Sequence, residues 1–201
     1  IYIILYSMYH HVYKIAQKIE EGVKRVPNVE VKMFRVEETL SDEVLELLHA
    51  KPPPDLPVIK SSDLPKADGF LFGTPTRYGI MSGPMKAFWD TTGGLWMKGA
   101  LQNKMAGVFF STGSQHGGQE TTALTFLTTF AHQGIIFVPL GKRHCHWHWH
   151  CGLDQIVGGS YYGAGTIAGA DGSREPSVIE YDMALTHGEH FATVVSDYMA
   201  G

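Results

Sequence analysis

Five short apolar runs alternate with segments of helical periodicity, and this alternation limits the possible folds more than any other feature of the sequence. The runs expected to be strands are Ile1–Tyr6, Val29–Val36, Gly69–Gly73, Met105–Ser111 and Ile135–Leu140. The first is continuously apolar, as is typical of a strand buried on both faces of a parallel sheet. Right-handed crossovers between such strands place helices on both faces of the sheet. We therefore predict a single α/β domain over residues 1–201, built on a doubly wound, five-stranded parallel sheet.

The segments between these runs predict helices and loops. Val12, Ile15, Ala16, Ile19 and Val23 recur at the spacing of one helix face. Further helices are expected at Thr39–His49, with Ser41 near its start, at Met85–Asp90, at Glu120–His132, and after Pro176, where Ile179, Met183, Phe191, Val194, Val195 and Tyr198 would point inward. The proline-rich Lys51–Pro57 and the glycine-rich Gly152–Ser173 are expected to be mostly loop.

Composition and charge argue against several classes of protein. A hydrophobic fraction of 44% fits a folded chain, and the net charge of −4 argues against a nucleic-acid partner, which requires a basic face. No apolar run approaches the roughly 20 residues of a transmembrane segment, and we expect no signal peptide. With only two cysteines, Cys145 and Cys151, we expect a cytoplasmic protein and leave peripheral membrane association open. Because Ile1 lies within a predicted strand, a few native residues are expected to precede it.

In a doubly wound sheet, a ligand binds outside the carboxyl ends of the strands, where the strand order changes direction. The first segment there, Ser7–His11, leads directly into a helix, whose free amides and dipole favour an anion. The chain has neither a Gly-x-x-x-x-Gly-Lys-Ser/Thr pattern nor a Gly-x-Gly-x-x-Gly after the first strand. A phosphate monoester is therefore the expected ligand, unless Ser7 serves only as a helix cap.

Two further loops carry residues suited to a flat ligand. Gly73–Gly79 combines a turn fixed by glycine and proline with the Tyr78 ring and the donors of Thr76 and Arg77. Small residues in Ser111–Gln119 would let the backbone lie along a ligand edge. Each loop alone is weak evidence, because Gly, Ser and Thr occur in turns of all kinds. Three such loops at successive strand ends favour one shared site.

Long motifs in these loops are similar to those of one known family. They are Ser7-Met8-Tyr9-x-His11, Gly73-Thr74-Pro75-Thr76-Arg77-Tyr78-Gly79, Thr92-Gly93-Gly94-Leu95-Trp96, Ser111-Thr112-Gly113 with Gly117-Gly118-Gln119-Glu120, Gly158-Gly159-Ser160-x-Tyr162-Gly163-Ala164, and Ala168-Gly169-Ala170-Asp171-Gly172-Ser173-Arg174-x-Pro176-Ser177. In this order they resemble the WrbA-type NAD(P)H:quinone oxidoreductases. The resemblance implies a flavodoxin-like fold, non-covalent FMN, and ping-pong reduction of quinones by NADH or NADPH through the flavin.

The resemblance also implies roles for individual residues. Ser7, Met8, Tyr9, His10, His11 and Val12 would hold the FMN phosphate, Pro75, Thr76, Arg77 and Tyr78 would line the isoalloxazine ring, and Ser111, Thr112, Gly113, Ser114, Gln115 and Gly117 would follow its far side. Trp96 would lie where quinone or nicotinamide stacks, and Tyr9 would touch the dinucleotide. His132, the candidate catalytic residue, would lie at the flavin and hydrogen-bond a quinone oxygen, unless it is only a polar residue at a helix end. The family forms homotetramers in which neighbouring subunits help to wall the pocket.

Two features depart from the family. His10 stands where the family usually has glycine, and if the position needs a positive φ, the histidine is strained and FMN affinity is expected to be lower. In an extended conformation, His144–Cys151 would place four histidines on one side, an arrangement that can chelate zinc or copper. Because the family has no metal centre there, we expect adventitious metal binding rather than a functional metal site.

Two other functions remain open on the sequence alone. One is a flavodoxin-type electron carrier without a substrate of its own, although such carriers are usually more acidic and need no pocket aromatic such as Trp96. The other is a scaffold or metal-binding protein with weakened FMN binding, which His10 and the histidine run would explain. Oxidation of NADH or NADPH with and without a quinone distinguishes the enzyme from both.

Overall fold

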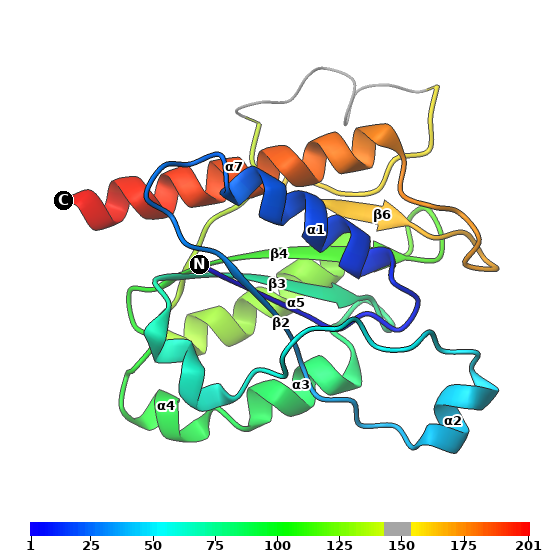
Figure 1. The fold of residues 1–201 in the computed structure, drawn as a ribbon, viewed down its shortest axis with the longest axis horizontal. Coiled ribbons are helices and arrows are strands. Elements are labelled where there is room, and N and C mark those ends of the chain that lie inside the picture. Colours follow the sequence, from blue (N-terminus) through cyan, green and yellow to red (C-terminus); the bar gives the residue numbers. More distant parts are fainter. Residues whose placement is uncertain (143–153) are drawn as a thin grey trace.

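A computed structural model describes residues 1–142 and 154–201. Its sheet consists of β1 (Tyr2–Leu5), β2 (Lys32–Arg35), β3 (Gly69–Pro75), β4 (Met105–Thr112), β5 (Ile136–Phe137) and β6 (Gly165–Ile167). Within the described chain these strands pair in parallel in the order β2-β1-β3-β4-β5, and β6 also pairs with β4 (Figure 1). The predicted parallel α/β sheet is confirmed.

Two short strands share the last position of the sheet. β5 pairs with Met105 and Ala106 at the start of β4, whereas β6 pairs with Phe110–Thr112 at its end. The prediction of one strand over Ile135–Leu140 was therefore too long, and the prediction of loop over Gly152–Ser173 missed β6. Strand formation at β6 depends on its pairing with β4 rather than on local propensity, which is why the glycine-rich sequence did not reveal it.

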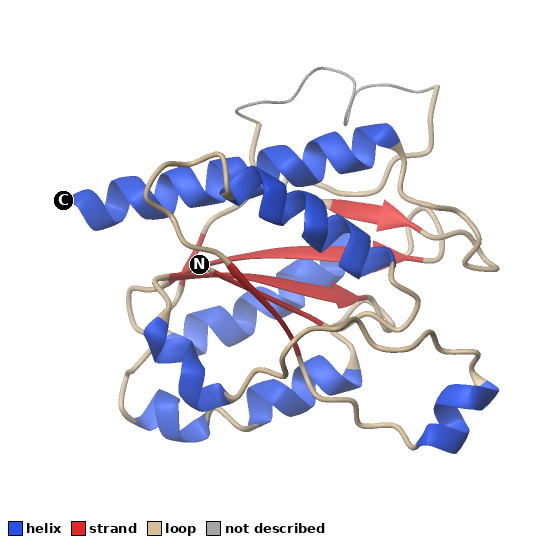
Figure 2. Ribbon diagram, in the orientation of Figure 1, coloured by secondary structure: helices blue, strands red, loops and turns tan. Residues whose placement is uncertain are grey.

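Helices cover both faces of the sheet, as expected (Figure 2). The helices are α1 (His11–Val23), α2 (Asp42–Leu47), α3 (Gly83–Asp90), α4 (Gly93–Met97), α5 (Gln119–Gln133) and α7 (Val178–Ala200), with a short 3₁₀ helix η1 (Ser61–Lys66). α1 and α7 enclose one hydrophobic core with β1, β3 and β4, and α3 and α5 enclose the other. α2 buries none of its residues and projects beyond the edge of the sheet (Figure 1).

Glycines bring α1 and α7 into direct backbone contact. A Cβ atom added to Gly188 of α7 would lie 2.0 Å from the carbonyl oxygen of Ile19. A Cβ atom added to Gly22 of α1 would lie 1.9 Å from the carbonyl oxygen of Leu185. No side chain fits at either position, so glycine is required for the two helices to approach this closely.

The last helix shows how far helical periodicity predicts burial. Met183, Phe191 and Val195 are buried as expected, but Tyr198 is 50% exposed, so its predicted inward position was wrong. The final turns of α7 extend past the sheet, where no neighbour covers them (Figure 1).

α4 was not predicted, because the two glycines at its start have low helix propensity.

No helix in residues 1–142 and 154–201 has both the length and the hydropathy needed to cross a bilayer. The same residues contain no group of three or more His, Cys, Asp or Glu side chains that could hold a metal ion. The histidine run His144–Cys151 lies outside the described residues.

Candidate functional site

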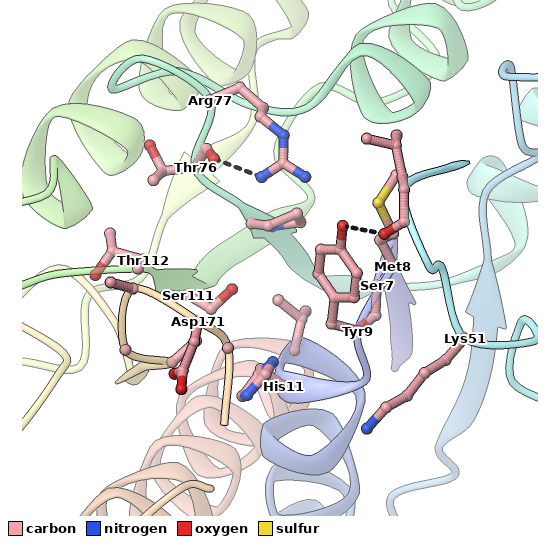
Figure 3. Close-up of a pocket in the computed structure, with 18 of the residues that line it drawn as sticks. Ser7, Met8, Tyr9, His11, Lys51, Thr76, Arg77, Ser111, Thr112 and Asp171 are labelled. Carbon is pink, nitrogen blue, oxygen red and sulfur yellow. Dashed lines mark hydrogen bonds between the residues drawn. The ribbon is translucent and has the colours of Figure 1, made fainter. Parts of the chain in front are cut away.

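A cavity of about 510 Å³ opens at the carboxyl ends of the strands, next to the change of direction in strand order between β1 and β3. It is lined by the predicted residues Ser7, Met8, Tyr9, His11, Val12, Pro75, Thr76, Arg77, Ser111, Thr112 and Gly113, and in addition by Leu48, His49, Lys51, Ala168, Gly169, Ala170, Asp171 and Gly172 (Figure 3). The volume is in the range of small-molecule and cofactor sites. The three loops that the sequence analysis singled out therefore converge on one cavity.

The turn between β1 and α1 forms the first wall. Ser7 is buried, and its Oγ accepts a hydrogen bond of 3.2 Å from the amide of Tyr13 in the first turn of α1, although the N-cap position itself is His10. In the described part of the chain, the amides of Tyr9 to Val12 have no hydrogen-bond acceptor. Free amides at the positive end of a helix dipole bind anions. This wall can hold a phosphate, while Ser7 also satisfies one amide of the first helical turn.

His10 has the positive φ on which the predicted strain depended. Its φ is 70°, in the left-handed region that costs a residue other than glycine roughly 1–2 kcal/mol. His10, predicted to hold the phosphate, does not line the cavity, and its Nε2–H donates to the carbonyl oxygen of Pro52 at 2.8 Å. That bond offsets part of the strain. The lower FMN affinity expected from His10 remains a prediction.

The turn after β3 forms the second wall. Arg77 and Ile80 exchange two backbone hydrogen bonds of 2.9 and 3.1 Å, and Tyr78 and Gly79 lie at the tip with φ values of 56° and 79°. Left-handed conformations at both central positions are those of a type I′ turn. The Arg77 guanidinium donates to the carbonyl oxygen of Thr76 at 2.8 Å (Figure 3). Tyr78 is fully exposed and does not line the cavity of its own chain.

The loop after β4 forms the third wall. Thr112 Oγ1 donates to the carbonyl oxygen of Ser114 at 2.8 Å and accepts a bond of 3.0 Å from Gln119 Nε2. These bonds hold Ser111–Gly113 against the cavity. The other predicted residues of this loop, Ser114, Gln115 and Gly117, line a second cavity of about 420 Å³ instead. The loop thus separates two cavities, and only its first part faces the larger one.

The fourth wall, Ala168–Gly172, was not assigned a role from the sequence. It follows β6 and is held by hydrogen bonds at its end, because the amide of Arg174 donates to the carbonyl oxygen of Ala168 at 2.9 Å. His11 Nε2–H, from the first wall, donates to the carbonyl oxygen of Arg174 at 3.1 Å. The glycines of the Ala168–Ser177 motif were the available signal, since Gly169 and Gly172 have φ values of 81° and 72°.

A buried carboxylate supports this fourth wall from below. Glu180, in the first turn of α7, has no solvent exposure and is paired with the Arg174 guanidinium at 3.0 Å. It also accepts hydrogen bonds from the amides of Gly158, Ile167 and Ser177 and from Thr166 Oγ1, at 2.7–3.2 Å. Glu180 therefore joins α7, β6 and the loops on either side of β6. The bond to Ser177 belongs to a capping box, which the sequence could have shown, whereas the bonds to Gly158, Thr166 and Ile167 span 13 to 22 residues and follow no local pattern.

Leu48, His49 and Lys51 form the remaining rim and were also missed. They follow α2, outside the strand ends where ligand loops are expected. Tyr9, from the first wall, donates its hydroxyl hydrogen to the carbonyl oxygen of Leu48 at 2.9 Å (Figure 3). The rim is therefore attached to the anion-binding turn.

His132 and Trp96 lie away from the cavity of their own chain. The amide of Asn103, just before β4, donates to the carbonyl oxygen of Gly134 at 2.9 Å, so α5 ends at the amino end of the sheet. Gln133 Nε2 donates to Thr92 Oγ1, at the start of α4, at 2.9 Å. His132 and Trp96 therefore occupy one exposed corner, formed by the end of α5 and by α4.

The charges of the lining differ from one end of the cavity to the other. Lys51 lies at the end near α1, Arg77 at the rim after β3, and Asp171 on the fourth wall (Figure 3). Burial lowers the pKa of His11, so the ring is neutral near pH 7 and its Nε2–H remains a donor. The cavity can hold an anionic group at α1 and a flat group between the turns after β3 and β4.

Comparisons with known proteins agree with this geometry. The family described as NADPH-dependent FMN reductase matches residues 11–143. The chain is 52% identical to quinone-oxidoreductase QR2 of Triphysaria versicolor over 96% of its own length and 94% of the relative's. It is 48% identical to an NAD(P)H dehydrogenase (quinone) of Aromatoleum aromaticum, over 99% and 97% of the two chains. A WrbA-like flavodoxin structure from Agrobacterium tumefaciens shares the fold with a TM-score of 0.67 at 21% identity, covering 98% and 96% of the two chains.

Proposed function

Because this chain belongs to the NADPH-dependent FMN reductase family, we propose that it binds FMN and reduces quinones to hydroquinones with electrons from NADH or NADPH. The observation that carries the proposal is the single cavity in which free helix amides face two turns suited to a flat ring. Relatives named as quinone reductases match almost the whole chain, which supports the same substrates here.

The lining fits FMN in its chemistry. The phosphate would be held by the amides of Tyr9 to Val12 and by Ser7, Met8 and His11, and the isoalloxazine ring would lie against Pro75–Arg77 on one side and Ser111–Gly113 on the other. FMN would supply the two-electron hydride chemistry, first accepting from the dinucleotide and then donating to the quinone. The residues of this chain would bind and orient the flavin, while Tyr9, which is 38% exposed at the rim, would contact the dinucleotide.

We propose that a neighbouring copy completes the pocket in a homotetramer. Trp96 and His132 are both exposed, on elements joined by the Gln133–Thr92 hydrogen bond, and neither lines the cavity of its own chain, so another copy would bring them to a flavin. In that position Trp96 would stack on a quinone or nicotinamide, and His132 would hydrogen-bond the quinone oxygen as negative charge develops on it. With only two cysteines, the enzyme is expected to work in the cytoplasm.

The proposed activity is tested with protein reconstituted with FMN. Oxidation of NADH or NADPH, followed by absorbance, is expected to rise when benzoquinone is added, because the reduced flavin then has an electron acceptor. If the flavin is reduced only through a partner reductase, the chain is an electron carrier. If the protein stays colourless and binds no FMN, the proposed function is wrong.

Trp96→Ala in FMN-loaded protein tests whether the exposed corner formed by α4 and the end of α5 contributes to the pocket of a neighbouring copy. Loss of one aromatic stacking contact of about 1.4 kcal/mol should lower quinone turnover about tenfold without changing FMN affinity. Met97→Ala is the control, since Met97 is the next residue and is 81% exposed. Sedimentation should give the mass of a tetramer for all three proteins. A monomer with full turnover would contradict the shared pocket.

A further inference from the structure

The segment Leu48–Pro52 is fastened to the turn between β1 and α1 by three hydrogen bonds. The Tyr9 hydroxyl donates to the carbonyl oxygen of Leu48 at 2.9 Å, and the amide of Lys51 donates to the carbonyl oxygen of Met8 at 3.1 Å. His10 Nε2–H donates to the carbonyl oxygen of Pro52 at 2.8 Å. Residues from three consecutive positions of the anion-binding turn therefore hold one distant segment. The backbone of Lys51 is fixed beside the start of α1.

The side chain of Lys51 places a positive charge at the same end of the cavity. Lys51 lines the cavity together with His11, and Figure 3 shows its side chain extending toward α1, with the ammonium on the side of the helix opposite His11 in this view. The positive charge of Lys51 makes a minor contribution to lowering the pKa of both His11 and Glu175. Glu175 is bound by Lys14, and within residues 1–142 and 154–201 no carboxylate forms an ion pair with Lys51. Lys51 is thus available to a ligand.

We propose that Lys51 is a specificity-determining residue, whose ammonium pairs with the phosphate of the flavin and selects FMN over riboflavin. This assignment rests on the proposed function. The free amides of the turn supply hydrogen bonds but no full charge, whereas an FMN phosphate carries up to two negative charges near neutral pH. Two other basic residues line the described cavity, but neither places a positive charge beside the phosphate. Arg77 lies on the wall after β3, and His11 is neutral because burial lowers its pKa. Lys51 supplies the missing charge.

The test compares FMN and riboflavin binding by quenching of flavin fluorescence in the wild type, Lys51→Gln and Lys51→Arg. Lys51→Gln is expected to weaken FMN binding about tenfold and to leave riboflavin binding unchanged, because riboflavin has no phosphate. Lys51→Arg should retain most of the preference. Lys60→Gln is the matched control, because the substitution removes the same charge from an exposed residue that lies outside the cavity lining.

Each of the other possible results leads to a different conclusion about Lys51 and about the proposed function. If the wild type binds FMN and Lys51→Gln keeps the same ratio of FMN to riboflavin affinity, the assignment of Lys51 is wrong and the proposed function stands. If FMN affinity is unchanged but the ratio of KM for NADPH to that for NADH rises, Lys51 reads the 2′-phosphate of the dinucleotide instead. If the wild type binds no FMN, the proposed function fails together with the assignment.

Discussion

Replacing Glu180 with alanine is expected to lower the free energy of unfolding by about 3–5 kcal/mol, the loss typical of a buried ion pair that is deprived of one partner. The substitution leaves the Arg174 guanidinium without its carboxylate and leaves the amides of Gly158, Ile167 and Ser177 without their acceptor. Unsatisfied buried donors are costly because they give up water and gain no bond in return. Urea denaturation of the purified variant measures the loss.

The same variant tests whether Glu180 supports the cavity as well as the fold. The backbone amide of Arg174 holds the pocket wall Ala168–Gly172 through Ala168, and Glu180 holds the Arg174 side chain. FMN affinity is therefore expected to fall along with stability. Glu175→Ala is the matched control. Glu175 is exposed, and its ion-pair partner among the described residues is Lys14 at the surface, where ion pairs contribute about 0–1 kcal/mol. Equal effects of the two substitutions would show that the buried network does not stabilise this wall.

Replacing Gly188 with alanine is expected to destabilise the protein by about 3 kcal/mol, at the upper end of what overpacking usually costs. The new methyl group would lie 2.0 Å from the backbone oxygen of Ile19, and a backbone atom cannot move aside as a flexible side chain can. The cost exceeds the roughly 1 kcal/mol by which alanine favours a helix over glycine. The first turn of α1 should shift with the helix, and FMN affinity should fall.

A matched substitution separates this steric effect from helix propensity. Gly93→Ala, at the start of α4, also places alanine for glycine in a helix, but an added Cβ there meets nothing within 4 Å. Its free energy of unfolding should be unchanged or slightly higher than that of the wild type. Thermal and urea unfolding of both variants measure the difference. Gly188→Ala with wild-type stability would mean that α1 and α7 can separate without loss.

Local sequence patterns predicted much of the site because its first three walls are continuous segments at strand ends. Ser7–Val12, Pro75–Arg77 and Ser111–Gly113 each follow a predicted strand, and the rule that ligands bind at carboxyl ends brings such segments together. Ser114, Gln115 and Gly117 continue the third segment but turn toward the second cavity. Sequence order does not show on which side of a loop a residue lies.

The apolar alternation, helical spacing and loop motifs predicted the parallel sheet, the helices on both faces and the place of the cavity, since the pattern that indicates each element lies in residues close together in the chain. Tertiary structure alone decided the split of the last strand position between β5 and β6, the burial of Glu180, and the attachment of Leu48–Pro52 to the first turn. These features arise from hydrogen bonds between segments far apart in sequence. Their partners are selected by the geometry of the packed chain, which local propensity does not encode.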